Sequence, residues 1–314
     1  IDAGDAKWGD GSSAPTQNSV DHGLVIRDDA GNEWVWVPVE ASVLSSMYVT
    51  VDSGVELSGN LGVTTKLYTN SATIGRAGDT VTITRDTPNT TEYREPDIGL
   101  EYDMDEKYYK TILGFESAKA MAEFFVNDYA KMINSIKKYG GFYIGRYELS
   151  SAGVQKDKET LTNTTWYEFY KKCTTLNASS KVESRMIWGI QWNLVSDFIS
   201  KKGEQKSIQD TSAWGNVMRA ISPANTGNYE KDTSGYGYSV KKNTGSNEAW
   251  KANNIYDLAG NCTEETQEAD NQYLRVYRGG CCRKSPTNFI SDGAINPRIS
   301  GGEVTTTRPV LIVK

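Results

Sequence analysis

The sequence predicts an α+β fold, in which helices and antiparallel strands occupy different stretches of the chain. Residues 23–40 contain two alternating apolar runs, so two strands are expected there. Apolar residues at helical spacing occur only between residues 117 and 202. The chain from residue 207 onward is rich in Gly, Asn, Ser and Thr, with brief apolar runs. That composition is typical of functional loops carried on a small scaffold.

The chain divides into a lead-in and one large domain. Residues 1–20 are rich in Gly, Ser, Asp and Ala without periodicity and predict a linker or stalk. Residues 21–314 predict a single domain that opens with a hairpin turning at residues 28–32. Residues 48–91 are dense in Thr, Val and Gly with period-two alternation, which predicts a β-rich insertion.

Three helices are expected in the middle of the chain. Ser117 can cap the first, whose apolar positions follow helical spacing until Gly140 ends it. A strand follows this helix at residues 142–150. Thr165 can cap a second, shorter helix, and a third is expected from about residue 191 to residue 202.

Composition excludes several classes of function. The 34 basic and 40 acidic side chains give a net charge of −6, so no cationic field attracts nucleic acid. His22 is the single histidine, which excludes metal sites built from several histidines and most imidazole-based catalysis. No stretch approaches the ~18 apolar residues of a membrane-spanning helix. We therefore expect no nucleic-acid partner and no membrane span in this chain.

Several motifs together resemble the formylglycine-generating enzyme (sulfatase-modifying factor) superfamily. They are NNIYDLAGNCTEETQEA, LRVYRGG and TRPVLIVK near the C-terminus, preceded in order by WVWVPV, GGFYIGRYE and SRMIWGIQWNLVSDFI. The resemblance covers residues 21–314 apart from the Thr-rich insertion. It implies a C-type-lectin-like fold with irregular loops, a scaffold that carries oxidases, iron-dependent sulfoxide synthases and binding proteins.

Two catalytic branches of this superfamily fit the sequence poorly. The oxidases hold copper with two cysteines a few residues apart beyond the Arg-Gly-Gly turn. Here Cys281 and Cys282 are adjacent to each other, and no cysteine follows them. The iron-dependent enzymes use a cluster of histidines, which His22 cannot form. We expect no catalytic cofactor and no enzymatic activity, with a copper-dependent oxidase acting on cysteine as the alternative.

The sequence also looks similar to the variable proteins of diversity-generating retroelements, which use C-type-lectin-like scaffolds. Their C-terminal segment is rewritten at template adenines, and an asparagine codon rewritten in this way cannot become Lys, Glu, Gln, Met or Trp. Between residues 281 and 300 only Lys284 belongs to that group. This pattern favours a ligand-binding protein with a variable C-terminal surface loop. An undiversified carbohydrate- or protein-binding module of the same fold is the alternative.

A stiff sheet would hold this loop so that its side chains can change without unfolding the core. Ligand contacts are expected from residue 280 to residue 302, where aromatic anchors mix with adaptable polar groups. The candidate ligand-binding residues are Tyr273, Tyr277, Cys281, Cys282, Arg283, Ser285, Thr287, Asn288, Phe289, Ser291, Asp292, Asn296 and Arg298. Each position could instead be an ordinary loop residue, Tyr277 could be buried, and the cysteine pair could serve as small packing residues.

The resemblance also implies a structural calcium ion. In the related enzymes, the loop matching Asp257, Gly260, Cys262 and Glu264 holds calcium through side-chain oxygens at both ends and carbonyls between them. This sequence keeps the two carboxylates, which are hard oxygen ligands of the kind calcium requires. Thr263 and Glu265 depart from the aromatic residues usual there. The alternative is a turn in which Asp257 caps an amide and Glu264 is solvated.

The expected partner is a protein or glycan ligand on another cell or surface. The Gly/Ser-rich lead-in suits an extracellular display arm, whether on a cell surface, a pilus or a phage. The sequence does not choose among these platforms.

Overall fold

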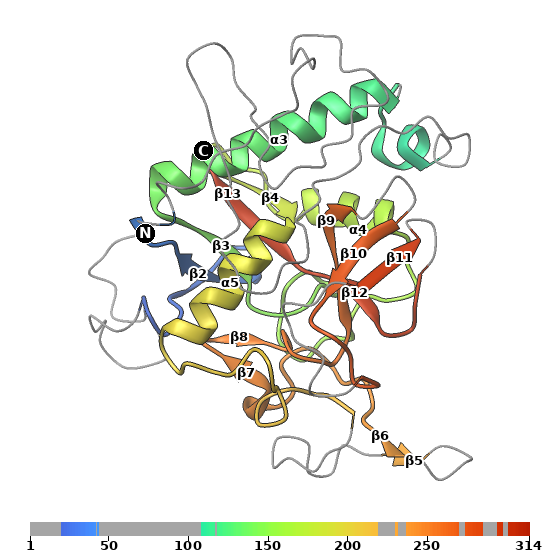
Figure 1. Cartoon of the computed structure of the whole chain (residues 1–314). Coiled ribbons are helices and arrows are strands. Elements are labelled where there is room, and N and C mark those ends of the chain that lie inside the picture. Colours follow the sequence, from blue (N-terminus) through green and yellow to red (C-terminus); the bar gives the residue numbers. More distant parts are fainter. Residues whose placement is uncertain are drawn as a thin grey trace.

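The computed structural model describes residues 20–41, 43, 108–116, 118–218, 230–231, 237–269, 274–284, 294–297 and 301–314. Most of the lead-in, the 48–91 insertion and the cap at Ser117 therefore lie outside the described residues. The described chain combines helices with two main sheets that are largely antiparallel, which confirms the α+β class (Figure 1).

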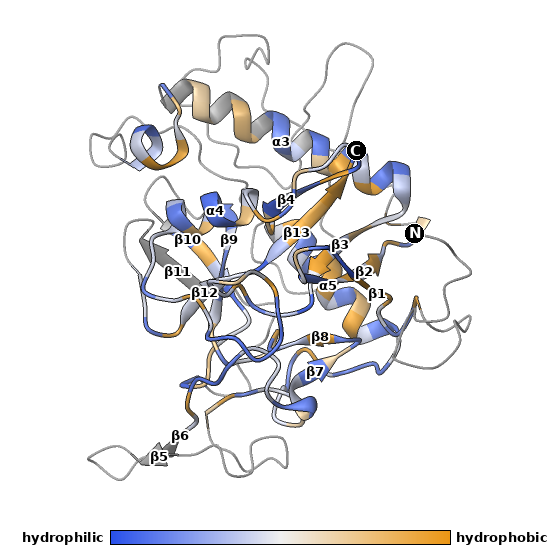
Figure 2. Ribbon diagram, turned by 180° about the vertical axis from the view of Figure 1, so that it is seen from behind, coloured by the Kyte–Doolittle hydropathy of each residue, from blue (hydrophilic) through white to orange (hydrophobic). Residues whose placement is uncertain are grey.

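The larger sheet has five strands in the order β1-β2-β3-β13-β4, and all its pairs are antiparallel. Its strands are β1 (Val25–Arg27), β2 (Glu33–Pro38), β3 (Gly141–Gly145), β4 (Val182–Met186) and β13 (Pro309–Val313). The strand nearest the C-terminus thus lies inside the sheet, between two strands from the first two thirds of the chain. Figure 2 shows β13 as strongly hydrophobic, as a strand covered on both faces must be.

Helices cover one face of this sheet. They are α3 (Ala118–Tyr139), α4 (Trp166–Thr174) and α5 (Gly189–Lys201). Helix α3 contacts β3 and β13, α4 contacts β4, and α5 contacts both β2 and the second sheet. Val35, Ile144 and Val310 from the sheet share one core with apolar residues of all three helices. On the other face, Trp34, Val154 and Leu311 form a smaller cluster.

The second sheet has four strands in the order β11-β10-β9-β12. They are β9 (Thr263–Ala269), β10 (Leu274–Arg278), β11 (Ala294–Pro297) and β12 (Thr305–Thr307). Strand β12 runs parallel to β9, whereas β10 is antiparallel to both β9 and β11. Figure 1 shows this sheet beside α4, with β11 at its outer edge. The minor elements are a π-helix (Tyr109–Leu113), a 3-10 helix (Glu248–Trp250), β5 (Glu230–Lys231), β6 (Gly237–Tyr238), β7 (Lys251–Ala252) and β8 (Ile255–Tyr256).

Local signals in the sequence predicted several of these elements correctly. The opening hairpin closes through hydrogen bonds between Asp28 and Asn32, and Gly31 adopts φ +86° in its turn. Gly140 ends α3 with φ +75° and donates its N–H to Ile136 O at 2.8 Å. Thr165 caps α4 as expected.

Other features had no local signal. The run TRPVLIVK was expected to form one closing strand, but Thr307 belongs to β12 in one sheet and residues Pro309–Val313 form β13 in the other, with Arg308 at the crossing between them. The π-helix at Tyr109–Leu113 was also not predicted. Among the described residues, no helix is both long and apolar enough to span a membrane.

Candidate functional site

The candidate binding segment, residues 280–302, connects β10 to β12 at the edge of the second sheet. Within it, β11 pairs with β10 in the register Leu274↔Pro297 to Tyr277↔Ala294. Asn296 therefore lies on the edge strand opposite Arg275. Strand β11 pairs with β10 on one side and ends the four-stranded sheet on the other (Figure 1).

The first end of the segment is fixed by backbone hydrogen bonds to the preceding loop. Gly279 O accepts from Gly260 N at 2.8 Å, and Cys282 N donates to Asn261 O at 3.1 Å. A Cβ on Gly279 would lie 2.7 Å from Leu258 O, so only glycine fits there. The chain is held again at Lys284, whose carbonyl accepts from Met218 N at 2.6 Å.

The second end is fixed against the loop before α4. Gly302 O accepts from Asn163 N at 3.1 Å. A Cβ on Gly301 would lie 2.5 Å from Thr164 N, so the backbones pack closely there. An ion pair of 3.1 Å between exposed Arg283 and Glu303 links the two ends, although an exposed pair adds only ~0–1 kcal/mol. The segment is therefore held at both ends by the surrounding loops and sheets, which we call the frame.

The structure describes some of the candidate ligand residues. Tyr277 is half-buried on β10, and this burial raises the pKa of its hydroxyl. Arg283 is exposed, as a ligand contact requires. Cys281 and Cys282 are buried, with 3% and 1% of their surface exposed. Their burial agrees with the packing interpretation and does not favour direct ligand contact. The side chain of Asn296 and the whole of Tyr273, Ser285, Thr287, Asn288, Phe289, Ser291, Asp292 and Arg298 lie outside the described residues.

A buried set of polar contacts supports the sheet beneath the segment. Arg278 on β10 pairs with Glu268 on β9, and both side chains are almost fully buried. The guanidinium of Arg275 lies 4.2 Å from the ring centre of Trp166, a cation–π contact. Trp166 in turn donates its indole N–H to Thr266 O at 2.8 Å, which fastens α4 to the sheet. The sequence did not predict these contacts of Arg275 and Arg278, because Trp166 and Glu268 lie on other elements.

Asn261 connects the segment to the rest of the frame. Its side-chain oxygen accepts from Asn216 Nδ2 and from Lys242 N, at 3.0 and 2.9 Å. Its side-chain nitrogen donates to Glu148 Oε2 and to Lys242 O, at 2.6 and 3.2 Å. With its backbone bond to Cys282, this buried residue joins four separate stretches of the chain.

The expected calcium ligands also lie in this buried region. Asp257 Oδ2 accepts from Gly245 N at 2.7 Å, and Cys262 N donates to Glu148 Oε1 at 2.9 Å. The carboxylate of Glu264 is bound by Arg308. Gly260 adopts φ +83°, and a Cβ there would lie 2.0 Å from Asn216 O. The four candidate residues thus belong to a hydrogen-bonded loop. The carboxylates of Asp257 and Glu264 are both fully buried. The alternative interpretation, a turn with a solvated Glu264, therefore does not hold for Glu264.

Burial dominates the electrostatics of this region. Burial raises the pKa of Asp257 to about 7, although the hydrogen bond from Gly245 and the charge of Arg308 each lower this pKa. Burial also raises the pKa of Glu148, with a further contribution from the nearby charges of Asp257 and Glu264. Within the stretches that the structure describes, no group of three or more His, Cys, Asp or Glu is arranged to hold a metal ion.

The thiols near the segment are held in their protonated form. Burial raises the pKa of Cys282 to about 12 and also raises the pKa of Cys262 and Cys281. Because the thiolate is the nucleophile and the ligand of soft metals, this environment disfavours both roles at neutral pH. Cys173 lies elsewhere, buried in the helical core.

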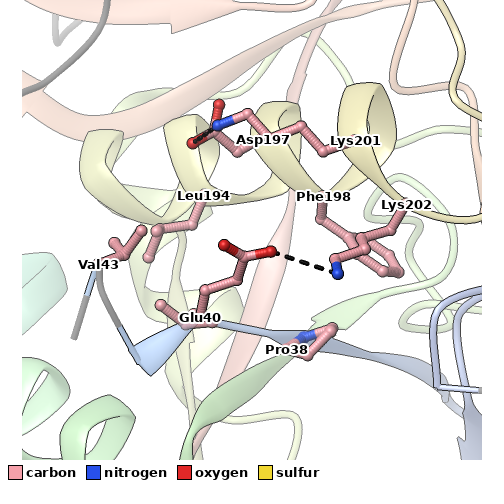
Figure 3. Close-up of a pocket in the computed structure, with 9 residues that line it drawn as sticks. Pro38, Glu40, Val43, Leu194, Asp197, Phe198, Lys201 and Lys202 are labelled. Carbon is pink, nitrogen blue, oxygen red and sulfur yellow. Dashed lines mark ion pairs between the residues drawn. The ribbon is translucent and has the colours of Figure 1, made fainter.

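A small pocket lies between the end of β2 and α5 (Figure 3). Its apolar walls include Pro38, Leu194 and Phe198, and an ion pair of 3.3 Å between Lys202 and Glu40 crosses it. None of the candidate site residues lines this pocket. It lies next to Val43, the last described residue before the Thr-rich insertion.

Comparison with known proteins gives little further information. No protein-family model matches the chain, and no curated protein matches it. The solved structure "Crystal Structure of CarF" is similar at TM-score 0.38 and 11% identity, over 55% of this chain and 87% of that chain. "Treponema denticola variable protein 1" is similar at TM-score 0.37 and 14% identity, over 55% and 85%. Similarity at this level assigns neither a family nor a function.

Proposed function

We propose that the protein is a non-catalytic binding protein that presents side chains of the segment 280–302, other than the buried Cys281 and Cys282, to a macromolecular ligand. The observation that supports this most directly is the fixation of both ends of the segment. Gly279 and Cys282 bond to the 260–261 loop at one end, and Gly302 bonds to Asn163 at the other. A segment held in this way is a defined surface even when its own side chains change.

Two buried contacts outside the segment join parts of the fold that carry it. Arg278 pairs with Glu268, and the side chain of Asn261 bonds to Glu148. We therefore expect changes of side chain between residues 285 and 300 to alter binding while the free energy of unfolding changes little. This separation between frame and contact surface is what a binding protein with a replaceable surface requires.

The finer parts of the proposal rest on the sequence. They are a C-type-lectin-like scaffold, diversification by a retroelement, a protein or glycan ligand, and display on a cell surface, a pilus or a phage. The scarcity of Lys, Glu, Gln, Met and Trp between residues 281 and 300 supports diversification. A neighbouring template repeat that differs from residues 270–312 only at adenines would separate a diversified protein from an undiversified binding module.

A pair of libraries tests the separation of frame and surface. The surface library varies Asn288, Phe289, Asp292 and Arg298, and the frame library varies the same number of buried positions, namely Asn261, Thr266, Glu268 and Thr306. We expect most surface variants and few frame variants to resist protease after display on yeast. Equal losses in the two libraries would contradict the proposal.

The surface library also tests binding itself. It is selected on immobilised hen egg-white lysozyme, a protein chosen as an arbitrary target. We expect enriched variants that bind this target when the unmodified protein does not, and whose binding weakens when single varied positions are restored to the parental residue. Binding by the unmodified protein itself, or a library without enriched variants, would contradict the proposal.

A further inference from the structure

The resemblance predicts a calcium ion in the loop from Asp257 to Glu264. The residues present in this loop do not fit that ion. We infer that Arg308 takes the place of the cation, so that the loop is held by a guanidinium of the protein itself and the fold does not depend on calcium. This inference does not rest on the proposed binding function.

Arg308 occupies the position facing Glu264. Its Nε donates to both carboxylate oxygens of Glu264, at 3.0 and 2.9 Å, and its Nη2 donates to the same carboxylate. Both side chains are fully buried. A planar guanidinium that binds both oxygens satisfies a carboxylate better than a point charge does. Glu264 is therefore already neutralised without an ion.

Two further N–H groups of Arg308 bind backbone carbonyls. Nη1 donates to Gly145 O at 2.9 Å, and Nη2 donates to Tyr256 O at 2.8 Å. Gly145 belongs to β3 in the five-stranded sheet, Tyr256 to β8, and Glu264 to β9 in the second sheet. One buried cation thus joins three elements, which is the structural role a bound metal ion would have.

Other oxygens of the loop are also occupied. Ala259 O accepts from Asn216 N at 3.0 Å, and Asn261 O accepts from Cys282 N at 3.1 Å. Asp257 Oδ2 accepts from Gly245 N, and Asp257 Oδ1 has no hydrogen-bond partner among the described residues. Calcium takes about 6–8 oxygen ligands. Asp257 Oδ1 alone, in a region that also holds the buried guanidinium of Arg308, does not meet that requirement.

The first test uses the unmodified protein. Its melting temperature is measured in millimolar CaCl2 and after treatment with EGTA, and calcium binding is measured by titration calorimetry. We expect equal melting temperatures and no binding heat at micromolar calcium. A melting temperature that falls in EGTA, together with loss of that difference in Asp257→Asn, would overturn the inference.

The second test asks whether Arg308 supplies the stability. Arg308→Met is compared with Arg283→Met, which removes an exposed arginine that also forms one ion pair. We expect Arg308→Met to lower the melting temperature by many degrees and Arg283→Met to leave it nearly unchanged. If Arg308→Met does not fold, Arg308→Lys keeps the charge but loses the paired hydrogen bonds, and we expect an intermediate loss. Similar melting temperatures for Arg308→Lys and the unmodified protein would contradict the role of the guanidinium.

Discussion

Asn261 shows how one side chain can fix the geometry of a whole surface. It adopts φ 55°, a left-handed conformation that asparagine tolerates better than most residues. In that conformation its amide reaches Asn216, Lys242 and Glu148 at the same time. The amide group supplies both a donor and acceptors, which neither aspartate nor leucine could do at this position.

We expect Asn261→Ala to lower the free energy of unfolding by about 3 kcal/mol, because buried polar partners lose their hydrogen bonds. Asn163→Ala is the matched control. Asn163 also has a left-handed backbone, at φ 57°, but it is exposed. Both variants carry the same backbone strain, so the difference measured by urea denaturation reports the buried hydrogen bonds. Equal losses in the two variants would mean that strain alone accounts for the effect.

The residues most important to the buried frame were the least predictable from the sequence. Cys281 and Cys282 were recognisable as candidates for packing, because small apolar side chains beside a Gly-Gly turn are often buried. Arg275, Arg278 and Arg308 gave no such signal. Their partners Trp166, Glu268 and Glu264 come from other elements, and sequence spacing does not report contacts made across a fold.

Helix α4 is the element that best illustrates prediction from local sequence. Thr165 Oγ1 accepts from Glu168 N at 3.3 Å, and Glu168 Oε2 accepts from Thr165 N at 3.0 Å. This reciprocal capping box needs only four consecutive residues, so the sequence alone identified the start of the helix. The helix then places Trp166 against both Thr266 and Arg275.

We expect Thr165→Ala to cost about 1 kcal/mol of stability through loss of the N-cap. Thr174→Ala at the other end of the helix is the control, because the hydroxyl of Thr174 donates to the nearby Lys171 carbonyl and caps no N–H group at the start of the helix. Urea denaturation of both variants measures the difference. A larger loss for Thr174→Ala would show that the capping box does not determine the stability of α4.

The second sheet marks the limit of such local reasoning. Strand β12 is three threonines long and pairs in parallel with β9, about forty residues earlier in the chain. Its three residues are all threonine, so its sequence has no alternation of apolar and polar residues that would predict a strand. All three side chains are nevertheless buried. The chain divides into β12 and β13 because each strand pairs with a different sheet. A short window of sequence does not indicate which sheet a strand joins.

At the scale of the whole molecule, the two sheets and three helices enclose an interior in which the thiols are neutral. We therefore expect no copper-dependent oxygen consumption when the protein is mixed with a cysteine-containing peptide. Burial raises the pKa of Cys262, Cys281 and Cys282, which disfavours the thiolates that copper would need. An oxygen electrode measures the outcome, with Cys281→Ser as the control. Oxygen uptake that depends on copper and disappears in this variant would identify the protein as an oxidase.

The place of β13 inside the five-stranded sheet has a consequence for biosynthesis. β3 and β4 cannot be bridged until residues 309–313 have left the ribosome, so the sheet closes only after the candidate binding segment has been translated. A frameshift or a premature stop within residues 280–302 would remove β12 and β13 and leave the sheet open at its middle. In-frame codon changes would leave both strands intact. Completion of the five-stranded sheet therefore requires that the reading frame be preserved through residues 280–302.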